Sequence, residues 1–127
     1  GCDGNNFVKT MLNLSKSHNE INVVNDQIGS PTFTYDLAKG ISEIIKTDKY
    51  GVYHLTNSGS CSWYEFSKEI FKLANINVKV TPVTTEEFPR PAPRPKYSVL
   101  SNDKWIKQGF KPLRNYKEAL KEYLLTC

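Results

Sequence analysis

The chain has 127 residues, of which 39% are hydrophobic and 24% charged, with a formal net charge of +4. This length and composition favour one folded domain and exclude a disordered or fibrous protein. The modest charge disfavours a nucleic-acid partner, which needs a basic stripe with interleaved aromatics, and no apolar run reaches the roughly 18 residues of a membrane span.

The three cysteines, Cys2, Cys61 and Cys127, are odd in number, widely spaced and free of CxxC spacing. This pattern is typical of reduced thiols and not of a disulfide framework, and with two isolated histidines it predicts no metal site. The chain starts without Met, and its single Met, Met11, lies inside a helical pattern. The sequence therefore predicts a cytoplasmic protein and favours a piece of a longer chain.

The first predicted elements are a helix, a strand and a loop. Residues 5–16 carry apolar side chains at helical spacing, which predicts a helix. Residues 21–25 are mostly β-branched, which predicts a short strand. Residues 27–31 contain a glycine and a proline, which favour a loop.

A second helix is predicted over residues 35–47, capped by Thr34 or Asp36. Its apolar stripe must be buried against another part of the protein. The stripe consists of Leu37, Ile41, Ile44 and Ile45. Residues 52–56 are mostly apolar and predict a strand covered on both faces, the last part of a parallel sheet.

A third helix is predicted after a turn rich in Ser and Gly, because Ser62 and Glu65 form a capping box before an apolar stripe. Residues 78–83 alternate in polarity and predict a third strand. Thr84 with Glu87 predicts a capped single helical turn.

Four prolines within residues 89–95 predict an extended, polyproline-like crossing. A short helix is predicted to begin at Ser101 and to stop at Gly109, and a last helix covers residues 115–125. Five helices and three strands without an internal repeat predict an α/β fold.

Five segments occur in the order in which dTDP-4-dehydrorhamnose reductases carry them, and they cover nearly the whole chain. They are GNNFVKTML, VVNDQIGSPT, GVYHLTNSGSCSWYEF, TTEEFPRPAPRPKYSVLS and GFKPLRNYKEALKEYL. The chain resembles the C-terminal, substrate-binding part of these enzymes, which are Rossmann-type members of the extended short-chain dehydrogenase/reductase family. The resemblance implies hydride transfer from NADPH or NADH in the last step of dTDP-L-rhamnose synthesis for cell-wall polysaccharide. It leaves open whether the full-length enzyme needs Mg²⁺ or forms a homodimer.

The cofactor site of that family is not matched in this chain. A dinucleotide fingerprint needs closely spaced glycines between a strand and a helix, whereas the seven glycines here are scattered. The family's catalytic Tyr-x-x-x-Lys motif also lies upstream of the matched region. We therefore expect residues 1–127 to be a substrate-binding lobe of helices and short strands, without catalytic, cofactor-binding or metal-binding residues. Its expected partner is an N-terminal NAD(P)-binding domain that is absent from the chain.

Tyr64 and Lys68 do form a Tyr-x-x-x-Lys pair, with both residues on one helix face. The structural interpretation is favoured, because Tyr64 is flanked by core-type Trp63 and Phe66 and no cofactor motif accompanies it. We expect this pair to play no part in catalysis.

A nucleotide diphosphate-sugar needs cationic or amide donors for its phosphates and an apolar surface for its base. By analogy with related sugar-nucleotide enzymes, Arg94 at the start of the RPxxSxL segment is expected to reach a phosphate. Arg90 points about 120° away along a polyproline path and is a weaker candidate. The resemblance also assigns Asn6 and Phe7, at the start of the first helix, to the diphosphate, where free N–H groups favour an anion.

Five further candidate contacts follow from the resemblance. Val24 matches a strand position beside the base, Gln27, Ser30 and Thr32 lie in the next loop, and Tyr97 is placed at the ribose. Many relatives have a phosphate-binding Arg in this loop, where this chain has Gly-Ser-Pro. Each candidate has a structural alternative: a solvated arginine, a helix cap, ordinary turn chemistry or a core tyrosine.

Two other functions fit parts of the sequence. A reductase-like protein can keep its fold, lose its chemistry and act as a binding or regulatory module. The proline-rich residues 89–95 are typical of an SH3 ligand, but they lie between packed elements and not in a tail. The predicted function is therefore that of the reductase part that holds the dTDP-sugar.

Overall fold

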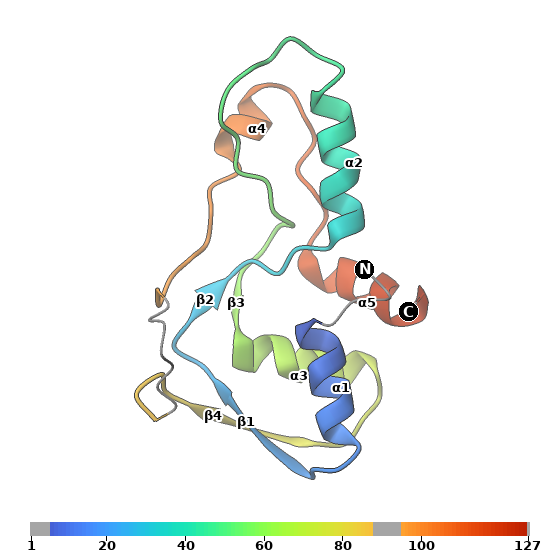
Figure 1. Cartoon of the computed structure of the whole chain (residues 1–127), viewed down its shortest axis with the longest axis vertical. Helices are drawn as coiled ribbons and strands as arrows, with labels where there is room; N and C mark the ends of the chain where they lie inside the picture. Colours follow the sequence, from blue (N-terminus) through green and yellow to red (C-terminus); the bar gives the residue numbers. More distant parts are fainter. Residues whose placement is uncertain (1–5, 88–94, 127) are drawn as a thin grey trace.

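The computed structural model describes residues 6–87 and 95–126. Figure 1 shows an elongated molecule with α1, α3 and the β1–β4 pair at one end, α2 and α4 at the other, and α5 between them. Helices and short strands alternate along the chain, which confirms the predicted α/β class. None of the helices in the described ranges is long and apolar enough to cross a membrane.

The β1–β4 end is built from α1 (Phe7–Ser15), β1 (Glu20–Val24), α3 (Trp63–Leu73) and β4 (Lys79–Val83). The two strands run parallel, with Val24 opposite Val83. Both were predicted, β1 from its β-branched residues and β4 from its alternating polarity. Both helices contact β1, and α3 contacts β4 as well.

The start of α3 has the predicted capping box. Ser62 Oγ accepts a hydrogen bond from Glu65 N at 3.0 Å, and Ser62 N donates to Glu65 Oε1 at 2.9 Å. The same hydroxyl donates to Asn25 Oδ1 at 2.7 Å, which ties the helix to the end of β1. Two short strands that the sequence did not predict, β2 (Ile28–Gly29) and β3 (Cys61–Ser62), pair antiparallel beside this cap.

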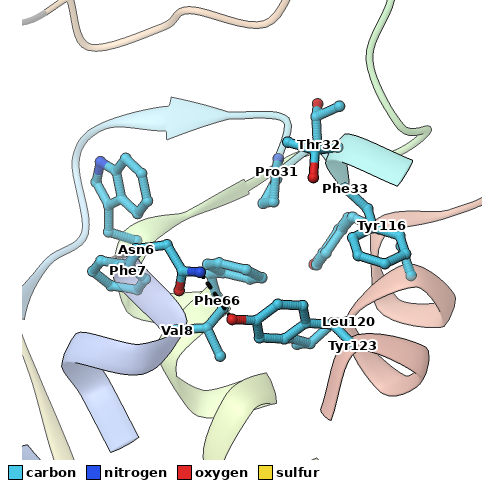
Figure 2. Close-up of a pocket in the computed structure, with 13 residues that line it drawn as sticks. Asn6, Phe7, Val8, Pro31, Thr32, Phe33, Phe66, Tyr116, Leu120 and Tyr123 are labelled. Atoms are coloured by element: carbon cyan, nitrogen blue, oxygen red, sulfur yellow. Dashed lines mark hydrogen bonds between the residues drawn. The ribbon is translucent and has the colours of Figure 1, made fainter. Parts of the chain in front are cut away.

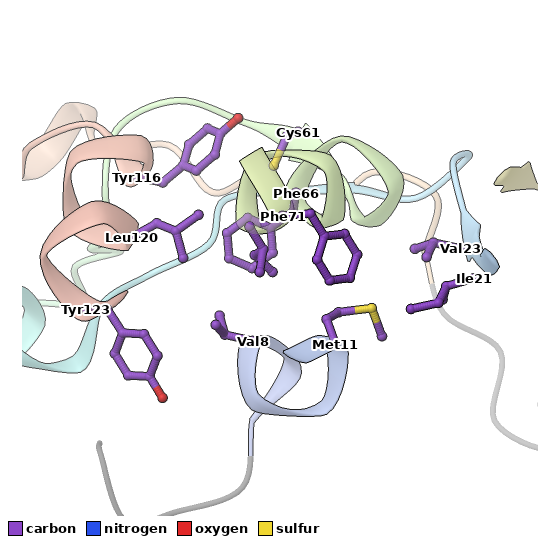
Figure 3. Packing of buried hydrophobic residues seen from close by; sticks show 11 residues of the cluster. Val8, Met11, Ile21, Val23, Cys61, Phe66, Phe71, Tyr116, Leu120 and Tyr123 are labelled. Atoms are coloured by element: carbon purple, nitrogen blue, oxygen red, sulfur yellow. The ribbon is translucent and has the colours of Figure 1, made fainter. Parts of the chain in front are cut away.

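The core lies where α1, α3, β1 and α5 (Tyr116–Thr126) meet (Figure 3). Its buried members are Val8, Met11, Ile21, Val23, Cys61, Phe66, Ile70, Phe71, Tyr116, Leu120 and Tyr123. The last helix lies one residue from its predicted bounds. It buries four of the five side chains that its pattern predicts for the core, Tyr116, Ala119, Leu120 and Tyr123, while the fifth, Leu124, is half-buried. Burial also raises the pKa of the Cys61 thiol, so this cysteine stays protonated.

Helix α2 (Thr34–Ile44) departs from the prediction in two ways. Phe33 occupies its N-cap position and no side chain caps it, so the predicted cap by Thr34 or Asp36 is wrong. Its apolar stripe, expected to be buried, is only partly covered within the described residues, since Leu37 and Ile44 are half-buried whereas Ile41 and Ile45 are 48% and 72% exposed. A stripe is buried only where a neighbouring element covers it, and within the described residues this face is largely uncovered.

Residues 52–56 are extended but form no strand, so the strand predicted there is wrong. A strand needs backbone hydrogen bonds to a neighbour. Within the described part of the chain, the Thr56 N–H instead donates to the Asn102 side chain at 3.1 Å. Gly40 lets this segment approach α2, because a Cβ there would lie 2.7 Å from Leu55 Cδ2.

The short helix α4 (Asp103–Lys107) begins two residues after the predicted start at Ser101, whose hydroxyl accepts a hydrogen bond from Asp103 N. Gly109 follows it with φ of 93°, which confirms the predicted stop. The predicted single turn after β4 is present as a hydrogen-bonded turn, in which Glu87 N donates to the Thr84 hydroxyl at 3.3 Å as the predicted pairing requires. Most of the predicted proline-rich crossing lies outside the described residues.

Candidate functional site

A pocket of about 260 Å³ opens between α1, α3, α5 and the loop that precedes α2 (Figure 2). Its lining is mostly aromatic and aliphatic, with polar groups from α1, the loop and α5. The lining residues are Asn6, Phe7, Val8, Pro31, Thr32, Phe33, Thr34, Trp63, Phe66, Tyr116, Ala119, Leu120 and Tyr123. Such a site suits a flat or apolar group whose orientation is fixed by a few polar contacts.

Asn6 lies at the pocket as the N-cap residue of α1. Its Oδ1 accepts a hydrogen bond from Lys9 N at 2.9 Å, and its Nδ2 donates to the Tyr123 hydroxyl at 2.9 Å. The side chain thus caps the helix and joins α1 to α5 (Figure 2). Asn6 therefore acts as a helix cap, which was the alternative to a role in binding. Its contact with substrate remains a prediction.

Phe7 lies beside Asn6 and belongs to an aromatic cluster. Its ring centroid is 4.7 Å from that of Trp63 and 5.8 Å from that of Phe66. All three rings line the pocket. An aromatic wall of this kind can pack against a base or the apolar face of a sugar.

Three loop candidates lie along one stretch that ends at the pocket. Gln27 Nε2 donates to Thr85 Oγ1 at 3.2 Å, and the Thr32 hydroxyl donates to the Ser30 carbonyl at 3.1 Å. Thr32 is exposed and lines the pocket, whereas Gln27 and Ser30 do not line it.

Tyr97 lies next to the same loop, because Ile28 N donates to the Lys96 carbonyl and Ser98 N donates back to the Ile28 carbonyl. Its side chain is 68% exposed, so the core alternative for Tyr97 is wrong. Val24, at the end of β1, is half-buried. The structure thus gathers Asn6, Phe7 and Thr32 at one pocket and leaves the other described candidates outside its lining.

Arg94, the predicted phosphate contact, and Arg90 lie outside the described residues. The Tyr64–Lys68 pair is described, and Lys68 Nζ lies over the Tyr64 ring at 5.3 Å from its centroid. This is a cation–π contact with the ring face. That the pair plays no part in catalysis remains a prediction.

The sequence did not single out a polar cluster behind the loop wall of the pocket. Asp36 is 8% exposed and receives hydrogen bonds from Arg114 Nε at 2.8 Å and Arg114 Nη2 at 3.0 Å. Desolvation alone would raise the pKa of Asp36, but the hydrogen bonds from Arg114 and Asn57 outweigh it and lower the pKa. Only the buried position of Asp36 in the fold reveals this cluster, since an Asp in the first turn of a helix is usually an exposed cap.

The ionisation of the lining groups bears on what the pocket can do. Burial, reinforced by a hydrogen bond to Cys61, raises the pKa of Tyr116, so its hydroxyl stays neutral. Among residues 6–87 and 95–126, no Asp, Glu, Lys, Arg or His lines the pocket. The pocket can therefore hold a ligand by packing and neutral hydrogen bonds.

The residues of this chain do not fit a dinucleotide cofactor. No three of its glycines have fingerprint spacing, and the Gly-Ser-Pro loop after β1 does not lead into the tight strand–turn–helix that approaches a pyrophosphate. Among residues 6–87 and 95–126, no three His, Cys, Asp or Glu side chains are grouped to hold a metal ion. We assign no step to a cofactor or metal held by this chain.

Comparison with known proteins defines the class. The fold matches part of extended short-chain dehydrogenase/reductases, and it aligns with a dTDP-4-dehydrorhamnose reductase from Bacillus anthracis, solved with NADP, at a TM-score of 0.94 and 49% identity. An ortholog from Clostridium acetobutylicum aligns at a TM-score of 0.93 and 57% identity, covering 96% of this chain and 44% of that one. The chain belongs to the family described as the RmlD substrate binding domain, which matches residues 1–127.

The matched proteins are longer than this chain. The spore coat polysaccharide biosynthesis protein SpsK of Bacillus subtilis is 47% identical over 124 residues, which is 98% of this chain and 43% of SpsK. The Bacillus anthracis structure is covered to 44%. The chain therefore spans less than half the length of these relatives.

Proposed function

We propose that this chain is the part of a dTDP-4-dehydrorhamnose reductase that holds the dTDP-sugar during reduction of dTDP-4-dehydro-L-rhamnose to dTDP-L-rhamnose. One observation carries the proposal. Asn6, Phe7 and Thr32, assigned to substrate from the sequence, come from separate segments and line one aromatic pocket. The names of the relatives support the same substrate class.

The chemistry of the pocket fits one part of this ligand. Its aromatic lining suits a pyrimidine base or the methyl-bearing face of a deoxy sugar. The start of α1 offers the positive end of a helix dipole to the diphosphate, and Arg94 is proposed to add a charge-assisted hydrogen bond. Val24, Gln27, Ser30 and Tyr97 are proposed to border the nucleotide beyond the pocket.

The remaining chemistry is proposed to belong to a second domain. NADPH or NADH, bound there, would supply the hydride, and a Tyr there would protonate the sugar oxygen. The role of this chain is to hold C4 of the sugar within reach, so that two reactants meet in one orientation. For the longer protein alone, we propose dependence on Mg²⁺, assembly as a homodimer and a cytoplasmic location.

The exposed apolar side of α2 supports a domain partner. Leu37, Ile41, Ile44 and Ile45 form a groove with Tyr53 and Leu55 of the unpaired extended segment. Val52 and Tyr50 beside it are 77% and 87% exposed. Contiguous apolar surface and an unpaired extended segment mark an interaction site, and we propose that the cofactor-binding domain covers them.

The test is turnover by the gene product that contains this chain. NADPH oxidation should depend on dTDP-4-dehydro-L-rhamnose and should yield dTDP-L-rhamnose, as followed at 340 nm and by mass spectrometry. The matched control is UDP-4-dehydro-L-rhamnose, which should react more slowly if the base is recognised. A protein that binds the dTDP-sugar but never oxidises NADPH would be the binding module weighed above, and one that binds neither would overturn the proposal.

A further inference from the structure

Arg114 joins α2 and α5, which both contribute residues to the lining of the pocket. On one side it holds Asp36, in the first turn of α2, through two hydrogen bonds of 2.8 and 3.0 Å. On the other its Nη2 donates to Glu122 Oε2 of α5 at 2.8 Å. Within the described residues, no other ion pair links two elements.

Asn57 extends this link to the loop wall. Its side chain is 1% exposed, with Nδ2 donating to Asp36 Oδ2 at 2.8 Å and Oδ1 accepting from Phe33 N at 2.6 Å. Nδ2 also donates to the Arg114 carbonyl at 3.1 Å. We name Asp36, Asn57, Arg114 and Glu122 the Arg114 network.

The network acts on the pocket through Phe33. The Phe33 ring lies under the Arg114 guanidinium, with Cζ 5.6 Å from the ring centroid. Phe33 and Thr32 line the pocket, and so do Ala119 and Tyr123 from the helix that carries Glu122. The Phe33 and Tyr123 rings meet edge to face, with centroids 6.1 Å apart, so the loop packs against α5 where Arg114 bridges the two.

We propose that Arg114 is a positioning residue that holds the loop before α2 against α5 by bridging Asp36 and Glu122, and so preorganises this loop for the sugar nucleotide. This inference rests on the proposed function. A planar guanidinium suits the role because it grips two carboxylates at fixed angles. If the bridge opens, the loop wall spends only part of its time at the binding distance, and affinity falls by that fraction.

Glu122 offers the sharpest variant. Its side chain is 44% exposed against 10% for Asp36, so Glu122→Gln releases the α5 end while Asp36 stays paired. Loss of a half-exposed ion pair changes stability little. Glu118→Gln is the matched control, because Glu118 is an exposed carboxylate in the first turn of the same helix.

The experiment measures binding of dTDP-L-rhamnose by calorimetry and melting temperature by circular dichroism for the unmodified chain and each variant. Glu122→Gln should weaken binding by about three- to tenfold with a melting temperature within about 3 °C, and Glu118→Gln should change neither. Glu122→Asp should recover part of the affinity, because it keeps the charge.

Three outcomes overturn the inference. If Glu122→Gln binds as tightly as the unmodified chain, the bridge does not position the loop. If the affinity of the Glu122→Gln variant falls only as far as its folded fraction falls, Arg114 stabilises the fold and does not position the loop. If the unmodified chain does not bind dTDP-L-rhamnose, the proposed function fails first and this inference with it.

Discussion

At the scale of single residues, Asp36 shows how much of a site depends on contacts that a sequence does not display. Its carboxylate is buried, yet Arg114 and Asn57 satisfy both oxygens. The sequence placed it in the first turn of a helix as a candidate cap, since local pattern is the only guide to such a residue. The partners lie 21 and 78 positions away.

This pairing predicts a pH dependence. The pKa of Asp36 is lowered from 3.8 in the folded chain, so its contribution to stability is present above about pH 4 and is lost as the pH falls through the lowered value. Asp36→Asn should cost about 3 kcal/mol at neutral pH and less at pH 3, because below about pH 4 the Asp36 carboxyl of the unfolded wild-type chain binds a proton and the native ion pair loses part of its stabilising effect. Urea unfolding at both pH values checks this, with exposed Asp103→Asn as control. A difference that does not change with pH contradicts the assignment.

Arg94 carries the prediction that depends on the resemblance alone. If it pairs with a diphosphate oxygen, Arg94→Ala in the longer gene product removes about 1.5–3 kcal/mol of binding, or roughly 10- to 150-fold. The phosphates do not react during hydride transfer, so the loss should appear in KM and leave kcat nearly unchanged. Arg94→Lys should recover part of it. An unchanged KM would make Arg94 a solvated surface residue.

The sequence predicted only part of the candidate site, and there is a physical reason why the rest was missed. Asn6, Phe7 and Thr32 stand in recognisable strings, and the structure brings them to one pocket. Tyr116 and Tyr123 were expected only as core residues, because an amphipathic helix has the same pattern whether its face fills a core or lines a cavity in it. Those two residues do both here.

At the scale of elements, the sequence correctly predicted the helix start and the strands that depend on residues close together in the chain. The Ser62–Glu65 capping box begins α3 at the expected residue, and β1 and β4 form where β-branched residues gather. The stripe of α2 is partly exposed and residues 52–56 form no strand, because burial and strand pairing both need a neighbour that the described chain does not supply.

The capping box gives a stability prediction. Ser62 is 1% exposed, accepts a hydrogen bond from Glu65 N and donates to Asn25. Ser62→Ala should therefore cost about 1–2 kcal/mol of unfolding free energy, since a cap and a second hydrogen bond are lost together. The control is Ser60→Ala at an exposed position of the preceding turn, which should cost less than about 0.5 kcal/mol. Equal losses in denaturant titrations would show that the cap does not stabilise α3.

At the scale of the whole molecule, the apolar side of α2 and the unpaired segment 52–56 should make the isolated chain associate. Light scattering should show dimers or larger species at high concentration, and Ile41→Lys with Ile45→Lys should reduce them. Lysines at two exposed sites of α4, Asp103→Lys and Ile106→Lys, serve as control. A compact monomer with a sharp, cooperative melting transition would argue for a self-sufficient domain.

The central claim is that this chain holds the sugar nucleotide and another domain holds the cofactor. Calorimetric titration of the 127-residue chain with dTDP-L-rhamnose and, separately, with NADPH tests it most directly. We expect saturable binding of the sugar nucleotide and no saturable binding of NADPH, because the glycine-rich cradle for a pyrophosphate is not in this sequence. Saturable binding of NADPH in the micromolar range, without binding of dTDP-L-rhamnose, would contradict it.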